Sequence, residues 1–159
     1  MERILEILEH DATMTPQQIA VMLDKDEAEV AAQIKAYEDN KTILGKRAVI
    51  NWDKTQRQQV SALIELKVTP QRGEGFDAVA ERIYQYEQVS SLYLMSGGFD
   101  IMVVVEGKTM QEVALFVAEK LAPMNNVIST ATHFVLKKYK VDGVVMDPDT
   151  EDKREVMYL

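Results

Sequence analysis

The residues best suited to bind a small molecule lie in one short segment, Gly97-Gly98-Phe99-Asp100. Two adjacent glycines can both adopt positive φ and present backbone N–H groups to an anion. Asp100, placed in a turn outside the core, supplies a carboxylate that can pair with an ammonium group. Together these groups suit the two charged ends of a free α-amino acid, whose side chain would then contact Met95 and Phe99. The alternative is a plain hairpin turn that uses Gly-Gly for its own geometry.

Most groups that enzymes rely on are missing from the rest of the sequence. Cysteine is absent, which excludes disulfides, thiolate nucleophiles and cysteine-ligated zinc. The two histidines, His10 and His133, lie in unrelated segments, and His133 reads as a packed strand residue. No phosphate-binding glycine-rich loop or dinucleotide fingerprint occurs. We therefore expect a protein that is not an enzyme, with no catalytic residues, no metal and no cofactor.

Composition predicts a water-soluble protein. The 159 residues are 47 % hydrophobic and 28 % charged, typical of one ordinary domain or two small ones. The longest apolar run, 113–118, is far shorter than the roughly 20 residues of a membrane-spanning helix. The first residues lack the layout of a secretion signal, so we expect a cytoplasmic protein without membrane association. The net charge of −8 argues against nucleic-acid binding, because such proteins are usually basic where they touch phosphate.

The first fifty residues predict three short helices. Thr15 can cap the second helix, with Pro16 at its first position and Gln18 completing a capping box. After a turn of a few residues, Asp26 can cap the third helix, with Glu29 three positions on. Two helices joined by such a turn are typical of the helix-turn-helix unit, whose second helix enters the DNA major groove. A small helical bundle without that function is the alternative.

The candidate DNA-binding residues follow from this unit. Side chains that could contact bases lie in the third helix and in the turn before it; these candidates are Lys25, Glu27, Gln33 and Lys35. Candidates for phosphate contacts follow the helix and are Lys41, Lys46 and Arg47. Residues 1–50 carry 6 basic and 10 acidic side chains, a difference of −4. A solvated helical face is therefore the competing interpretation.

The remaining sequence predicts an α+β domain. A strand-like run over 43–52 could be a wing or a connecting strand, and the polar residues 53–59 mark a boundary. Alternating or continuous apolar residues then predict strands, and helical spacing predicts helices, in the order strand 60–69, helix 76–83, strand 91–95, strand 100–106, helix from 109, strand 128–136. This βαββαβ order is the ferredoxin-like unit, with both helices on one face of an antiparallel sheet. The expected domains are 1–52, a (winged) helix-turn-helix, and 60–159, a ferredoxin-like domain.

One strand of the expected sheet is apolar on both faces. It reads Ile101-Met102-Val103-Val104-Val105, where a half-solvated strand would alternate. Because the two helices can cover only one face, the other must meet another surface. A second copy of the chain is the simplest candidate, so we expect a homodimer.

The order of these elements resembles the Lrp/AsnC family of leucine-responsive and asparagine-operon transcription regulators. The resemblance covers nearly the whole chain and rests on five segments: Thr15 to Ala20, Val30 to Lys35, Ile43 to Trp52, Gly97 to Ile101, and Thr130 to Leu136. It implies a regulator that binds double-stranded DNA and assembles through its C-terminal domain into dimers or higher even-numbered oligomers. That domain commonly binds an amino-acid effector between subunits.

The resemblance also assigns residues and leaves an alternative open. It adds Thr130 and Thr132 to the effector candidates Met95, Gly97, Gly98, Phe99 and Asp100. The family commonly has arginine where this chain has Gln33 and Ala36, and glycine at the position of Lys41. The alternative function is therefore an amino-acid-sensing or assembly module whose acidic helix-turn-helix has lost DNA binding. The related sirohaem decarboxylases need additional histidine and arginine, which argues against that activity here.

Overall fold

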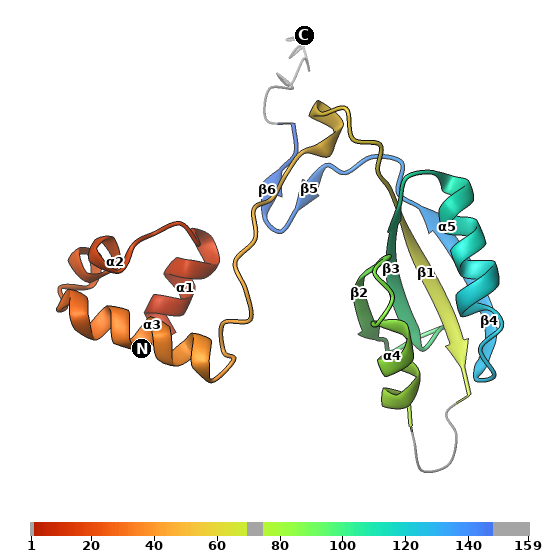
Figure 1. Cartoon of the computed structure of the whole chain (residues 1–159), viewed down its shortest axis with the longest axis horizontal. Helices are drawn as coiled ribbons and strands as arrows, with labels where there is room; N and C mark the ends of the chain where they lie inside the picture. Colours follow the sequence, from red (N-terminus) through yellow and green to blue (C-terminus); the bar gives the residue numbers. More distant parts are fainter. Residues whose placement is uncertain (1, 70–74, 148–159) are drawn as a thin grey trace, which may run out of the picture. The chain divides into compact units, whose positions relative to one another are not determined.

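The computed structural model describes residues 2–69 and 75–147, and the chain forms two compact units, Met1–Val49 and Ile50–Leu159. The first unit is helical and the second is built on a four-stranded antiparallel sheet (Figure 1). Among the described residues, no helix has the length and hydrophobicity needed to cross a membrane. Residues 148–159 of the expected second domain lie outside the described ranges.

Three helices make up the first unit: α1 (Glu2–His10), α2 (Pro16–Leu23) and α3 (Glu27–Asp39). Their apolar faces form one core, whose buried members are Ile4, Leu8, Ile19, Ala20, Val30 and Ile34. Only residues 24–26 separate α2 from α3, and the chain turns there because Asp24 adopts a left-handed conformation with φ 51°. The three predicted helices are thus present, with the spacing expected of two helices joined by a tight turn.

The strand predicted over 43–52 is wrong. Residues 43–51 form no strand, and Trp52–Lys54 is a short 3-10 helix, η1. The apolar residues of this segment serve other purposes: Ile43 donates its N–H to the Tyr37 carbonyl (2.9 Å) and packs on the helical core. A wing built from this run is therefore absent from the part of the first unit that the structure describes.

Residues 50–54 belong to the second unit, although the sequence analysis placed the first boundary at residue 52. The Asn51 side-chain amide donates to the Met146 carbonyl (2.6 Å), and Lys54 Nζ lies 3.8 Å from Asp147 Oδ1. These long-range contacts attach the segment to the far end of the described chain, which local sequence patterns cannot predict.

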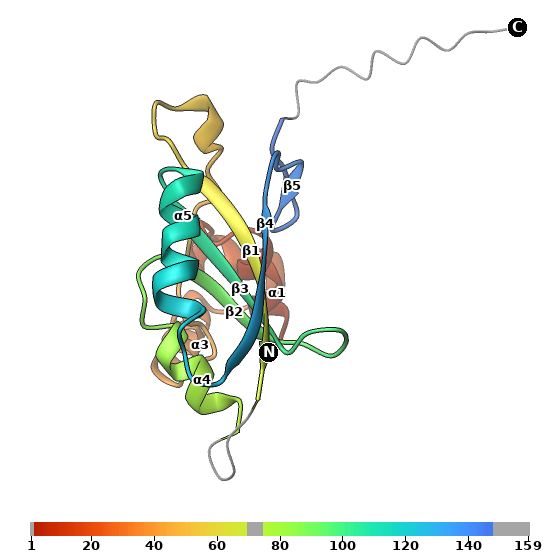
Figure 2. The ribbon, with the colours of Figure 1, turned by 90° about the vertical axis from the view of Figure 1, so that its right-hand side faces the viewer.

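The second unit has the predicted βαββαβ order. Strands β1 (Val60–Val68), β2 (Val89–Leu94), β3 (Ile101–Gly107) and β4 (Val127–Phe134) pair antiparallel in the order β2-β3-β1-β4. Helices α4 (Asp77–Ile83) and α5 (Met110–Phe116), the latter continued by the π-helical turn η2 (Val117–Leu121), cover one face of this sheet (Figure 2). The core lies between the helices and that face.

Strand register divides the sheet into a covered and an open face. On the covered face Ile64 lies opposite Val103 and both are fully buried. On the open face Leu63 lies opposite Val104, and both are only half-buried. His133 also belongs to the open face, where its side chain is 56 % exposed and its Nε2 lies 3.2 Å from Glu65 Oε1. The expectation of a packed histidine is therefore wrong, since none of the described helices covers this side of β4.

A second, two-stranded sheet follows β4 and was missed by the sequence analysis. It consists of β5 (Lys140–Val141) and β6 (Val144–Val145). The turn between them, Asp142-Gly143, has φ of 46° and 82°. Positive φ at both central residues is what a type I′ hairpin turn requires, and Asp-Gly is a preferred sequence for it. The signal was therefore present in the sequence.

Candidate effector and DNA-binding sites

The predicted effector loop connects β2 to β3. The Met95 N–H donates to the Asp100 carbonyl (2.8 Å), which closes the hairpin. The loop stands out from the sheet on the side away from α4 and α5 (Figure 2). Gly97 has φ 138°, where a side chain is rarely tolerated, but Gly98 has no positive φ in this turn. The expectation that both glycines use positive φ is thus wrong for Gly98, although a side chain there would still meet only open space.

Asp100 has a structural role that the sequence did not reveal. Its Oδ2 accepts the backbone N–H of Val68 at the end of β1 (2.8 Å), and its own N–H donates to the Leu66 carbonyl (3.0 Å). The carboxylate is half-buried and holds the hairpin against the neighbouring strand. The view of Asp100 as a turn residue outside the packed structure is therefore wrong.

The two threonines lie elsewhere on the sheet. Thr130 is opposite Leu66 and Thr132 is opposite Ile64, so both belong to the covered face, because directly opposed residues share a face. The effector loop projects from the other side. Within one chain the structure thus gathers Met95, Gly97, Gly98, Phe99 and Asp100 in one hairpin, and leaves Thr130 and Thr132 apart from them.

In the helical unit, side-chain caps fix where α2 and α3 begin. Thr15 and Gln18 form the predicted capping box, with Thr15 N–H to Gln18 Oε1 at 2.8 Å and Gln18 N–H to Thr15 Oγ1 at 3.3 Å. Asp26 Oδ2 accepts the N–H groups of Ala28 (2.9 Å) and Glu29 (3.2 Å). The side chain of Glu29 forms an ion pair with Lys25. Before α2, hydrogen bonds from the Thr13 hydroxyl and backbone N–H lower the pKa of the exposed Asp11 carboxyl.

The seven DNA-binding candidates differ in how available they are. Lys25 is paired with Glu29, and Lys46 Nζ lies 3.0 Å from Glu38 Oε1. Lys35, Lys41 and Arg47 are exposed, and within residues 2–69 and 75–147 none of them forms an ion pair with a carboxylate. Glu27 is exposed at the first position of α3, and Gln33 is half-buried farther along it.

Arg3 is a basic side chain that the sequence analysis did not select. It lies with Lys25, Glu29 and Gln33 around one hollow of about 370 Å³ between the helices. No local pattern marks Arg3, because α1 is twelve or more residues away from the turn that brings these side chains together. The hollow adds a cation to two of the predicted DNA-binding residues.

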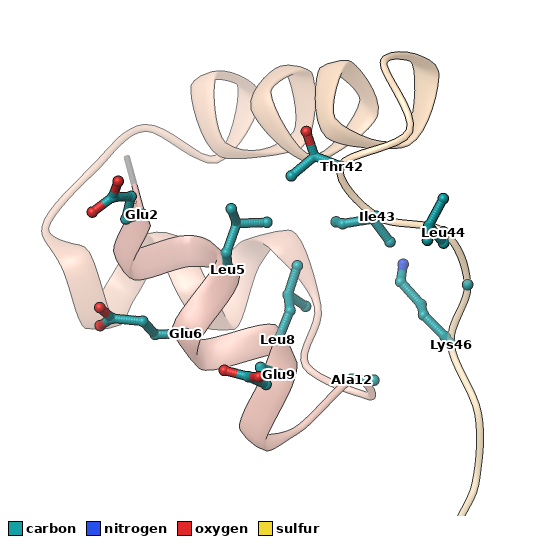
Figure 3. A pocket seen from close by; sticks show the side chains of 11 residues that line it. Glu2, Leu5, Glu6, Leu8, Glu9, Ala12, Thr42, Ile43, Leu44 and Lys46 are labelled. Carbon is teal, nitrogen blue, oxygen red and sulfur yellow. The ribbon is translucent and has the colours of Figure 1, made fainter. Parts of the chain in front are cut away.

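A second groove of the helical unit has the wrong charge for DNA. It holds about 550 Å³ between α1 and residues 42–46. Leu5 and Leu8 point from α1 toward Ile43, while Glu6 and Glu9 lie along the same helix (Figure 3). Of the DNA-binding candidates, only Lys46 is among the residues that line this groove. Because carboxylates here would repel phosphate, the other six candidates lie in parts of the unit better suited to DNA.

Comparison with known proteins identifies the family. The family model described as the Lrp/AsnC ligand binding domain matches residues 61–145. The uncharacterized HTH-type transcriptional regulator YugG of Bacillus subtilis is 46 % identical over 97 % of this chain and 93 % of its own. The HTH-type transcriptional regulator LrpA of Pyrococcus horikoshii is 31 % identical over 86 % of this chain and 94 % of its own.

Solved structures share the fold. A transcriptional regulator of Neisseria meningitidis, solved as a complex with L-Met, superposes with a TM-score of 0.69 at 19 % identity, covering 87 % of this chain and 88 % of that one. The two sequence relatives are named as transcriptional regulators and not as enzymes. On the family match and on its similarity to YugG over nearly its full length, the chain belongs to the Lrp/AsnC family of transcriptional regulators.

Proposed function

We propose that the protein is an amino-acid-responsive, DNA-binding transcriptional regulator that assembles through the open face of its sheet and works in the cytoplasm. The observation that carries this proposal is the joint presence of a capped helix-turn-helix arrangement and a second unit that matches a ligand-binding domain. Each part has its own physical argument.

In the DNA-binding part, α3 is the recognition helix. Glu27 and Gln33 provide polar groups toward the bases. Phosphate contacts come from Lys35, Lys41 and Arg47. Lys25 and Lys46 contribute only if they exchange their carboxylate partners for phosphate. Because two of the five lysine and arginine candidates are already paired, each helical unit releases few counterions and binds weakly. Several units linked in one assembly recover affinity through effective concentration.

Assembly follows from the open face of the sheet. Leu63, Met102 and Val104 are half-buried there and Tyr93 is 54 % exposed, and no helix within residues 2–69 and 75–147 covers them. An apolar sheet face of this kind is best buried against its own copy, which favours a homodimer with two-fold symmetry. Further pairing of such dimers gives the higher even-numbered oligomer that we propose.

The effector site is then shared between subunits. One chain presents the hairpin residues Met95, Gly97, Gly98, Phe99 and Asp100, and another presents Thr130 and Thr132. The division of these residues between opposite faces within a single chain supports this arrangement. The regulator from Neisseria meningitidis, crystallised with L-Met, supports an amino acid as the ligand class.

The alternative is an amino-acid-sensing or assembly module without DNA binding. It is favoured by the excess of 10 acidic over 6 basic side chains in residues 1–50. Electrophoretic mobility of the DNA upstream of the protein's own gene, at low and at physiological salt, separates the two functions. Retardation at low salt that weakens with salt supports the regulator. Absence of retardation at both, with an amino acid that still raises the melting temperature, supports the sensing module.

A further inference from the structure

Two positively charged side chains from separate helices of the first unit meet at one hollow beside α3. This hollow of about 370 Å³ is lined by Arg3 from the start of α1, by Lys25 from the turn before α3, and by Glu29 and Gln33 from α3 itself. Glu29 and Gln33 are four positions apart, so they lie on the same side of the helix. Because a recognition helix in the major groove has a DNA backbone on either side, a hollow at the side of α3 is placed to meet phosphate.

The two cations at this hollow differ in how available they are. Arg3 is exposed and forms no ion pair within residues 2–69 and 75–147. Lys25 is paired with Glu29, and the two side chains are 38 % and 59 % exposed. The N–H groups of Ala28 and Glu29 already donate to Asp26 Oδ2, so these two backbone groups are not available to an anion. Binding of phosphate at this place therefore depends on the side chains.

We infer that Arg3 and Lys25 bind one phosphate of the DNA backbone, and that the Glu29 carboxylate competes with this phosphate for Lys25. The inference rests on the proposed DNA-binding function and deepens it by naming a residue that limits the affinity. A guanidinium group can donate two parallel hydrogen bonds to one phosphate, so Arg3 provides a contact that needs no exchange of partners. Lys25 adds its contact only when its ammonium group leaves Glu29.

The strength of the Lys25–Glu29 pair sets the size of this effect. An exposed ion pair between side chains four positions apart on a helix is weak, so phosphate can displace the carboxylate. The competition still lowers the affinity of each helical unit for DNA about two- to fivefold, the equilibrium constant of such a pair. It also withholds one cation from those that release counterions on binding.

The Glu29 carboxylate thus acts as an internal competitor of DNA. It keeps the affinity of a single helical unit below the level that its own cations could provide. Because linked units bind through their effective concentration, a small loss in each unit is multiplied in the assembly. Glu29 therefore makes DNA binding depend more strongly on how many helical units bind together.

Fluorescence anisotropy with the full chain tests the inference on two labelled duplexes of equal length, one from upstream of the protein's own gene and one of shuffled sequence. Glu29→Gln keeps the size of the side chain and removes its charge. We expect it to bind both duplexes about two- to fivefold more tightly per helical unit, because phosphates carry no sequence information. The slope of log affinity against log salt should steepen by about 0.9 per unit. Glu9→Gln removes an exposed carboxylate of α1 away from the hollow and is the matched control, which should leave both quantities nearly unchanged.

Variants of the two cations complete the test. Arg3→Gln should bind DNA about threefold or more weakly at low salt and lower the slope by about 0.9 per unit, whereas Arg3→Lys should retain the slope. When Lys25→Gln is already present, adding Glu29→Gln should tighten binding less than about twofold, because Glu29 then has no cation to hold.

The outcomes separate this inference from the proposed function. If the parent protein binds DNA and either Glu29→Gln or Arg3→Gln leaves the affinity and the slope unchanged, the inference is overturned and the DNA-binding function stands. Equal gains in Glu29→Gln and Glu9→Gln would show a general effect of net charge and would also overturn it. A parent protein that binds neither duplex at low salt overturns the inference and the DNA-binding function together.

Discussion

Asp100 provides the sharpest test of how the hairpin is held. Its carboxylate accepts the N–H of Val68 at 2.8 Å, and Val68 is 4 % exposed. Asp100→Ala removes the acceptor and leaves that N–H at a buried strand end without a partner. A hydrogen bond to a charged group contributes about 1.5–3 kcal/mol, so we expect the second unit to lose about 2 kcal/mol of unfolding free energy. Asp100→Asn keeps an oxygen in place and should lose less than half as much.

Urea unfolding measures this loss. Trp52, the single tryptophan, lies in the second unit, so its fluorescence reports on that unit, with circular dichroism as the second probe. Because the slope in urea is about 1–3 kcal/mol per molar for small proteins, a loss of 2 kcal/mol shifts the midpoint by about 1 M. Equal midpoints for Asp100→Ala and the parent protein would refute the structural role of this carboxylate. Equal losses for the alanine and asparagine variants would show that the retained oxygen does not accept the N–H.

Three further predictions concern other features of the chain. Lys41 has φ 64° just after α3, a conformation that disfavours side chains, so Lys41→Gly should stabilise the helical unit by about 1 kcal/mol in thermal unfolding, while Lys41→Ala should not. Gly97→Val should lower the melting temperature and Gly98→Val should not, because only Gly97 has positive φ; equal effects would contradict the turn geometry. Val104→Asp on the open face should convert the dimer into a folded monomer by light scattering, and a variant that remains dimeric would exclude this face as the interface.

The sequence was sufficient for features that depend on neighbouring residues. Capping at Thr15 and Asp26 and the alternation of apolar residues in β1 are local patterns, and both appear in the structure. The apolar run 43–52 was read as a strand because periodicity reports hydrophobicity and not the availability of a pairing partner. Because no strand pairs with it in the described chain, residues 44–51 form no regular element, and Trp52 begins a 3-10 helix.

The candidate sites depended on contacts that no local pattern reveals. Residue types in the hairpin suggested a ligand for Asp100, but its bond to Val68 joins residues 32 positions apart. Likewise, only the three-dimensional position of Glu38 shows that Lys46 is paired. The pairing of Lys25 with Glu29 is different, because their i,i+4 spacing is a local pattern that the sequence contained.

The central claim, that an amino acid alters DNA binding by this protein, is tested most directly by fluorescence anisotropy. Labelled DNA from upstream of the protein's own gene is titrated with the full chain, with and without the amino acid that most raises the melting temperature. We expect the affinity for DNA to fall steeply as the salt concentration rises. The Lys35→Ala variant should bind all DNA sequences more weakly, by a similar factor. Adding the amino acid should change the affinity of the full chain for DNA. Binding that is unchanged by every amino acid, or no binding even at low salt, would contradict this claim.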